Sequence, residues 1–354
     1  MRKLLAPLAL LLASATPAHA QTVEGAAEGD AILKDFTFAT GEKLPELKMH
    51  YTTLGTPQRD KKGNVTNAVM ILHGTGGTGK QFFQPQFANE LFGPGQPLDT
   101  RKYYIILPDN IGHGGSSKPS DGMRMTFPKY DYDDMVGAQY RMLTEKLGVH
   151  KLKLILGTSM GCMHAFVWGQ THPDFAEKLA PFACLPVEIA GQNRMWRTLS
   201  IDAIKADPLW NGGNYINPPA SSLRTAASLT MIAGANPYAL QAQYPTRAAA
   251  EKYKDEAFAR TYGRNDANDV IYQLDSSRTY NPWPNLEKIK VPMLWINSAD
   301  DFINPPAYGI TEKAAARLPT AKFILIAASP ETKGHGTHTW AKFWKDDLAK
   351  LMAQ

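Results

Sequence analysis

The sequence predicts an α/β fold in which a mostly parallel sheet, with helices on both faces, carries a helical cap insertion. Short apolar runs typical of strands buried on both faces alternate with helix-compatible stretches. One run, at residues 153–156, leads directly into the G-x-S-x-G pattern of residues 157–161. The alternation stops between residues 187 and 285, which are rich in Ala, Tyr, Trp and Pro. These three observations indicate a sheet-based core interrupted by a cap.

Residues 1–20 are predicted to be a signal peptide that is removed before folding. Arg2 and Lys3 give a positive start, residues 4–12 form an apolar run, and residues 18–20 form a small-x-small cleavage site. The run is too short to span a bilayer as a stable helix. We therefore expect a secreted protein, located in the periplasm of a Gram-negative bacterium and without an integral membrane segment after cleavage. The alternative is a retained N-terminal anchor.

Charge and cysteine content narrow the function classes further. The formal net charge of +5 falls to +3 once Arg2 and Lys3 are removed, and no basic block is interleaved with aromatic residues. Nucleic acid is therefore not expected as a partner. Two cysteines, Cys162 and Cys184, cannot make a disulfide framework. Two buried free thiols are expected, and a single bridge between them is the alternative.

Residues 21–186 are predicted to form the first part of the core. Residues 36–39 and 47–54 are expected to pair as antiparallel strands across a turn. A helix is expected at residues 133–147, with Gly148 placed to end it. The remaining strands of this part are expected at residues 68–72, 103–107, 153–156 and 179–185.

Residues 187–285 form the predicted cap, and residues 286–354 complete the core with strands expected at 291–296 and 322–327. Sites in parallel sheets form where the strands end at their carboxyl edge. The cap is therefore expected to cover this edge. Its aromatic residues are candidates either for a pocket lining or for a packed core: Trp196, Trp210 and Tyr215.

Ser159 is the candidate nucleophile. The G-x-S-x-G pattern is typical of a serine on a tight strand-to-helix turn, where small neighbours avoid clashes with the strained backbone. An apolar run precedes it and a helix-compatible stretch, residues 162–170, follows it. The alternative is a glycine-flanked turn without chemistry.

The loop after the first buried strand, residues 73–77, is a candidate oxyanion hole. Acyl transfer needs two backbone donors directed at the developing oxyanion. The N–H groups of Thr75 and Met160 are the candidates. The same loop nearly matches a phosphate-binding G-x4-G-K pattern, but Gln81 stands where a serine or threonine should hold Mg²⁺.

The base and the acid should follow the serine in the order acid, then histidine. Histidines that precede Ser159, or lie on the helix after it, are unsuitable, which leaves His335 and His338. His335 is favoured because two glycines flank it on a loop after the last strand. Asp300 and Asp301 both follow the strand at 291–296, and Asp301 is favoured for its spacing to a downstream proline. No metal site is expected, since H-E-x-x-H and paired-cysteine motifs are missing.

With these residues placed, the chain resembles the alpha/beta-hydrolase superfamily, and within it the homoserine O-acetyltransferase-like branch. The resemblance covers almost all of the chain after residue 20, at residues 41–55, 109–119, 202–215 and 266–268. The cap matches are the more specific ones, because many hydrolases share the elbow. The resemblance implies a Ser159–Asp301–His335 triad, a covalent acyl-enzyme, no cofactor, and a cap that often mediates dimerisation. A homodimer through the cap is therefore expected.

Two departures from that branch weaken the expectation of homoserine as substrate. An arginine that holds the substrate carboxylate is replaced by Ile201, and an aspartate directly after the catalytic histidine is replaced by Gly336. Arg194 or Arg197 could hold a carboxylate instead, from one or two turns earlier. We therefore expect an exported serine hydrolase acting on a small ester or related acyl compound. Acyl transfer to a hydroxyl acceptor is the alternative, and a binding protein without catalysis is a third.

Overall fold

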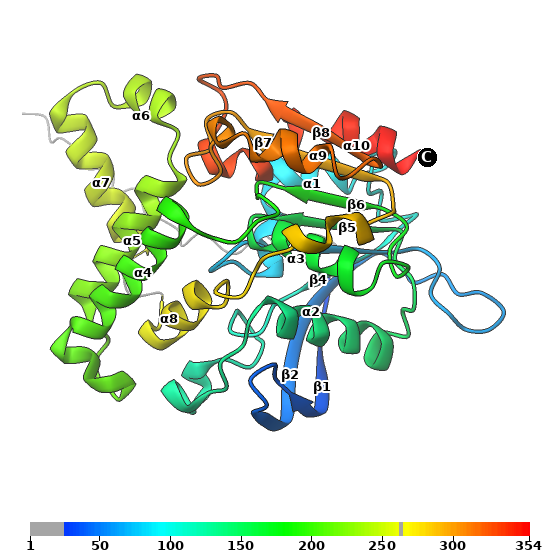
Figure 1. Cartoon of the computed structure of the whole chain (residues 1–354), viewed down its shortest axis with the longest axis horizontal. Coiled ribbons are helices and arrows are strands. Elements are labelled where there is room, and N and C mark those ends of the chain that lie inside the picture. The colour runs from blue at the N-terminus through cyan, green and yellow to red at the C-terminus, as the bar shows by residue number, and fades with distance from the viewer. Residues whose placement is uncertain (1–24, 262–264) are drawn as a thin grey trace, which may run out of the picture.

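The computed structural model describes residues 25–261 and 265–354, and the predicted signal peptide, residues 1–20, lies outside this part of the chain. An eight-stranded sheet has the order β1-β2-β4-β3-β5-β6-β7-β8 (Figure 1). β1, β2 and β4 pair antiparallel, and every other neighbouring pair is parallel. This confirms the predicted α/β fold. The strands are β1 (Ala27–Thr37), β2 (Lys43–Leu54), β3 (Ala68–Leu72), β4 (Tyr104–Pro108), β5 (Leu154–Thr158), β6 (Leu179–Phe182), β7 (Met293–Ser298) and β8 (Ala321–Ile326).

The central strands are apolar throughout because helices cover both faces of the sheet. In β3, Met70 and Ile71 are both fully buried, but successive side chains point to opposite faces. Met70 packs in a cluster with residues of α2 and α3, and Ile71 packs in a second cluster with residues of α1 and α10. These four helices are α1 (Pro85–Leu91), α2 (Tyr132–Arg141), α3 (Met160–Thr171) and α10 (Lys345–Met352).

The first and the sixth strand differ in length from the prediction. β1 begins at Ala27 instead of residue 36. The sequence lacks a regular polar/apolar alternation there, because the apolar Ile32 between buried Ala31 and Leu33 is exposed and Lys34 and Asp35 both face solvent. β6 ends at Phe182 instead of residue 185, because Ala183 adopts a left-handed backbone with φ of 66° that turns the chain out of the sheet.

The predicted helix at residues 133–147 forms in two parts. α2 is followed directly by a short π-helical segment, η4 (Met142–Leu147), and Gly148 ends it with φ of 65°, a left-handed conformation that glycine adopts without strain. Within the described residues, no helix is long and apolar enough to cross a membrane. The remaining short elements of the core are η1 (Gly79–Phe83), η2 (Pro119–Asp121), η3 (Arg124–Thr126), η6 (Trp283–Lys288), η7 (Pro306–Tyr308), α9 (Ile310–Ala315), η8 (Gly334–Thr339) and η9 (Ala341–Phe343).

Helices replace strands between β6 and β7, as the loss of alternation indicates. They lie together beside one edge of the sheet (Figure 1). Ile201 and Ile204 of α4 pack against Ala226 of α5 and Ile271 of α8 in a small core of their own. The helices are α4 (Gly191–Ala206), η5 (Pro208–Gly213), α5 (Ala220–Gly234), α6 (Pro237–Gln243), α7 (Arg247–Thr261) and α8 (Ala267–Asp275).

The two cysteines form a disulfide, so the expectation of two free thiols is wrong. Cys162 lies in the first turn of α3, and Cys184 follows the turn at Ala183, with the two Cα atoms 5.9 Å apart. This spacing is within the range that disulfides require. Both residues are fully buried. The bond therefore ties the helix after Ser159 to the segment after β6.

Replacing Cys162 and Cys184 together with alanine should lower the free energy of unfolding by about 3 kcal/mol, because the bond closes a loop in the unfolded chain. The measurement is urea denaturation of the oxidised protein and of the double variant. The reduced wild-type protein is the control, and it should unfold at nearly the same urea concentration as the variant. Equal stability of all three samples would contradict the prediction.

Candidate active site

Ser159 lies at the sharp turn between β5 and α3. Its backbone has φ of 56° and ψ of −111°, a conformation that residues other than glycine rarely adopt. The turn is held from both sides, since Ser159 N–H donates to the Phe182 carbonyl and the Ser159 carbonyl accepts from Met163 N–H. The side chain remains partly accessible. This is the strained strand-to-helix turn that the sequence predicts.

The two glycines of the pattern are required by close backbone contacts. A Cβ on Gly157 would lie 1.9 Å from the Gly161 carbonyl oxygen, and a Cβ on Gly161 would lie 2.1 Å from the Leu72 carbonyl oxygen. Real atoms cannot approach so closely. The turn around Ser159 therefore packs directly against the carboxyl end of β3.

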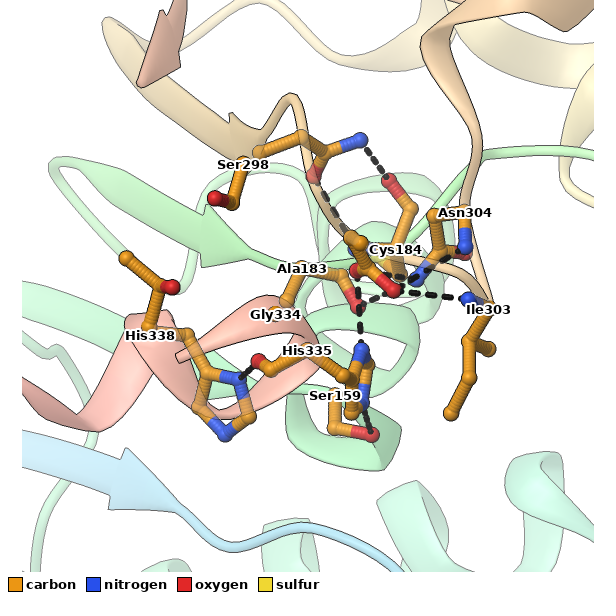
Figure 2. Close-up of polar contacts among 12 residues, drawn as sticks. Ser159, Ala183, Cys184, Ser298, Ile303, Asn304, Gly334, His335 and His338 are labelled. Carbon is orange, nitrogen blue, oxygen red and sulfur yellow. Dashed lines mark hydrogen bonds and ion pairs between the residues drawn. The ribbon is translucent and has the colours of Figure 1, made fainter. Parts of the chain in front are cut away.

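His335 lies between Ser159 and Asp301. Its Nε2 is 2.8 Å from Ser159 Oγ, and its Nδ1 is 2.8 Å from Asp301 Oδ2 (Figure 2). A carboxylate can only accept, so Nδ1 carries the proton and Nε2 is free to accept from the serine hydroxyl. The structure thus brings three predicted residues into one hydrogen-bonded chain.

Asp301 is buried, and several neighbouring groups donate hydrogen bonds to its carboxylate. Burial alone would raise its pKa, but the charge and hydrogen bond of His335, together with bonds from Asn304 Nδ2 and Ile303 N–H, hold the pKa below its usual value. A second backbone group, Asn304 N–H, also donates to Oδ1. Asp301 is therefore an ionised acceptor with a fixed orientation.

Asp300, the alternative acid, points elsewhere. Its Oδ2 accepts from Thr332 Oγ1 at 2.7 Å and from Gly334 N–H at 3.1 Å, and its Oδ1 accepts from Ser298 Oγ. These contacts tie the loop after β7 to the loop that precedes His335. Asp300 thus supports the position of the histidine without touching it.

His338, the alternative base, does not reach Ser159. Its Nδ1–H donates to the His335 carbonyl, and the two rings meet edge to face with centroids 5.0 Å apart. Burial, followed by the charge of His335, lowers the pKa of His338 to about 3. His338 is therefore a neutral neighbour that packs against His335.

The loop after β3 lies beside Ser159. A Cβ placed on Gly74 would be 3.3 Å from Ser159 Cβ. In the described part of the chain, no acceptor is hydrogen-bonded to the N–H groups of Thr75 or Met160. His73 Nδ1–H donates to the Gly74 carbonyl at 2.8 Å, and in a trans peptide this turns the Thr75 N–H to the opposite side. Both predicted oxyanion donors are thus unoccupied.

A buried polar network beneath this loop was not predicted. His73 Nε2 accepts from Asn110 N–H, and Asn110 Oδ1 accepts from Gln139 Nε2, whose amide oxygen accepts from Trp168 Nε1. Burial lowers the pKa of His73 to about 4, so the ring stays neutral and can accept at Nε2. The signal available was a histidine placed at the end of a fully apolar strand, which must find partners inside the core.

The loop does not have the geometry of a phosphate site. Gly79 N–H, which such a site would use, donates to Asp109 Oδ1, and Lys80 pairs with Glu28 on β1. Within residues 25–261 and 265–354, no group of three His, Cys, Asp or Glu side chains is arranged to hold a metal ion.

A cavity of about 300 Å³ lies between the loop after β3, residues 73–77, and the cap helices. Thr75 and Gly76 line it on the core side, and Trp196 is among the cap residues that line it. Trp210 and Tyr215 pack on the cap core, where Trp210 Nε1 donates to Asn268 and Tyr215 OH donates to Asp266. All three aromatic residues thus pack against the cap core, and Trp196 also lines the cavity.

Comparison with known proteins agrees with this geometry. The family model described as the alpha/beta hydrolase fold matches residues 67–330, more than half of the chain. The homoserine O-acetyltransferase of Solidesulfovibrio magneticus is 31% identical over 321 residues, covering 86% of this chain and 76% of the relative. The chain belongs to the alpha/beta-hydrolase family, in its homoserine O-acetyltransferase-like branch.

Solved structures share the fold of more than nine-tenths of the chain. Homoserine O-acetyltransferase from Bacillus anthracis has a TM-score of 0.81 at 21% identity, covering 94% of this chain and 99% of that one. The acetyl esterase MekB also has a TM-score of 0.81, at 22% identity, covering 93% and 97%. With the family membership, this makes the chain an enzyme of the esterase or O-acyltransferase kind.

The structure shows the surroundings of Ile201 and Gly336, the two residues that differ from the homoserine acetyltransferase pattern, and of the two arginines near them. Ile201 is 6% exposed and packs in the cap core, and Gly336 offers no side chain. Arg194 pairs with Asp275. Arg197 is 2% exposed, and its Nε donates to Asn193 Oδ1. Its buried Nη1 has no hydrogen-bond partner within the described residues, and the guanidinium lies over the Trp196 ring, 4.8 Å from the ring centroid.

Proposed function

We propose that this enzyme is a serine hydrolase that cleaves an ester or related acyl compound through an acyl-enzyme on Ser159. Ser159 Oγ attacks the carbonyl carbon while His335 Nε2 takes its proton. Asp301 orients His335 and stabilises the imidazolium form. The N–H groups of Thr75 and Met160 stabilise the oxyanion. The alcohol leaves with the proton from His335, and water then releases the acid and restores Ser159.

The hydrogen-bonded chain from Ser159 through His335 to Asp301 carries this proposal. The 2.8 Å between Ser159 Oγ and His335 Nε2 supports direct proton transfer from the serine, and the 2.8 Å between His335 Nδ1 and Asp301 Oδ2 supports the orienting role of the aspartate. The strained backbone at Ser159 and the unoccupied donors beside it support the same assignment.

Ile201 and Gly336, which differ from the homoserine acetyltransferase pattern, favour hydrolysis over acyl transfer to homoserine. A zwitterionic acceptor needs groups that bind its carboxylate and its amine, and buried polar pairing is the main source of such specificity. Ile201 and Gly336 supply neither group.

Transfer to an acceptor that carries a carboxylate is the second candidate function. Arg197 is the observation that favours it: its buried guanidinium lies over the Trp196 ring, but its Nη1 has no hydrogen-bond acceptor within the described residues, and a substrate carboxylate could supply one. In that case an acceptor hydroxyl, instead of water, would resolve the same acyl-enzyme.

The proposal includes export to the periplasm. The N-terminal pattern of residues 1–20 supports it. The buried Cys162–Cys184 disulfide supports it independently, since such bonds form and persist in oxidising compartments and are rare in the cytosol.

The test follows the acyl group. Purified protein that begins at Gln21 receives short-chain aryl esters, with and without homoserine or simple alcohols, and mass spectrometry quantifies free acid and new ester. Mostly free acid, whatever acceptor is present, is the expected result. Acyl transfer to homoserine that is lost in Arg197→Met would establish the second candidate instead. A serine-directed phosphonate should label Ser159 in peptide maps, and a folded sample that stays unlabelled would contradict both functions.

A further inference from the structure

We propose that the cavity beside the oxyanion loop binds the acyl group of the substrate, and that it selects an uncharged, apolar acyl chain longer than acetyl. This inference rests on the proposed function, because it assumes an acyl-enzyme on Ser159. It adds which part of the substrate the cavity holds and which chemical class that part belongs to.

The cavity begins beside the loop that packs against Ser159, although Ser159 and His335 are not among its lining residues. Gly74 lies against Ser159, and Thr75 and Gly76, the next two residues of the loop, line the cavity. Thr75 also supplies one of the proposed oxyanion donors. A carbonyl carbon bonded to Ser159, with its oxygen at the Thr75 N–H, would therefore direct one substituent toward the cavity.

That substituent is the acyl chain. In the tetrahedral intermediate, the bond that breaks joins the carbonyl carbon to the alcohol oxygen, and this oxygen must face His335 Nε2 to receive its proton. Among the described residues, the lining contains Thr75, Gly76 and cap residues but no residue of the His335 loop. The cavity is therefore on the side of the group that stays on Ser159.

The lining of the cavity is mostly apolar, and its polar side chains, those of Thr75, Thr230, Asn265 and Gln273, are uncharged. Its cap side comes from α4, α5, α7 and α8, with Ala227 and Met231 on α5 and Val270 on α8. Asp, Glu, Lys, Arg and His are missing from the lining among the described residues. A terminal carboxylate on the acyl group would lose its hydration there and would meet only these neutral polar groups, with no cationic partner among the lining residues that the structure describes. The cavity thus disfavours a succinyl group and favours a hydrocarbon chain.

The cavity is larger than an acetyl group requires. A volume of about 300 Å³ is at the small end of ligand pockets in general. An acetyl methyl would leave most of it empty. Each further methylene buried there should raise kcat/KM about threefold to fourfold until the cavity is full.

The experiment compares para-nitrophenyl acetate, butyrate, hexanoate and octanoate in the protein that begins at Gln21. Wild-type kcat/KM should rise at least about tenfold from acetate to hexanoate. Ala227→Phe should remove this increase, because the added ring occupies the cavity. Met231→Ala should move the optimum to a longer chain, because it enlarges the cavity.

Ile232→Phe is the matched control. Ile232 is the next residue on α5, it is 60% exposed, and it is not part of the lining. This variant should keep the wild-type chain-length profile. Were Ala227→Phe to fail to fold, Met231→Ala would still test the cavity through its opposite shift.

The outcomes separate this inference from the proposed function. A profile that Ala227→Phe and Met231→Ala leave unchanged, in an enzyme whose turnover depends on Ser159, would overturn the acyl cavity and leave the hydrolase standing. A preference for acetate in the wild-type protein would overturn it as well. Turnover that persists in Ser159→Ala would instead overturn the proposed function.

Discussion

Replacing Ser159 with alanine should lower kcat for ester cleavage by roughly 10⁶-fold, as loss of the nucleophile does in other triad enzymes. The only side-chain hydrogen bond of Ser159 within the described residues is to His335 Nε2. The substitution therefore removes the atom that forms the acyl-enzyme and disturbs little else. The strained backbone at φ of 56° is held by neighbouring carbonyl and N–H groups, which the variant keeps.

Initial rates with an aryl ester, measured alongside thermal unfolding, check this prediction. The unfolding free energy should change by no more than about 1 kcal/mol. Ser221→Ala, on the exposed surface of α5, is the matched control and should keep full activity. Substantial turnover by a folded Ser159→Ala protein would show that the acyl group is not carried by this serine.

Replacing Asp301 with asparagine should lower kcat about 10⁴-fold while the protein stays folded. Two backbone N–H groups, from Ile303 and Asn304, donate to Oδ1, so the amide oxygen must take that position. The amide NH₂ then faces His335 Nδ1 and donates to it. His335 is thereby left with its proton on Nε2, where it can no longer accept from Ser159.

Asp300→Asn is the comparison that separates the two neighbouring carboxylates. An asparagine oxygen can still accept from Thr332 Oγ1 and Gly334 N–H, so we expect activity within about tenfold of wild type and a modest loss of stability. The pair is compared by kcat and by urea denaturation. The reverse order, with the larger kinetic loss in Asp300→Asn, would assign the acid to Asp300.

The core strands and the turn at Ser159 could be predicted because local sequence determines them. β3 reads as five consecutive apolar residues, and the glycines at 157 and 161 are required by close backbone contacts. β1 could not be delimited, because its alternating pattern is interrupted by polar residues that face solvent. Periodicity shows a strand clearly only where burial is regular.

The details of the candidate site depend on tertiary geometry. Chain order limits the acid to two adjacent residues, but only the folded loop shows that Asp301 faces His335 while Asp300 faces Thr332. The disulfide depends on the left-handed turn at Ala183, which brings Cys184 next to α3 and which no local pattern indicates. The hydrogen bonds of His73 likewise join segments that are far apart in the sequence.

The position of the cap between β6 and β7 has a consequence for how this enzyme can diversify. Tyr280, which follows α8, donates its hydroxyl to the carbonyl of Leu185, which precedes α4, so the segment that returns from the cap lies next to the segment that enters it. The entropy of closing such an excursion grows only slowly with its length, by about 0.6 kcal/mol for each doubling. Helices can therefore be lengthened, shortened or exchanged there without moving Ser159, Asp301 or His335. Substrate preference can change in this way while the reacting groups remain in place.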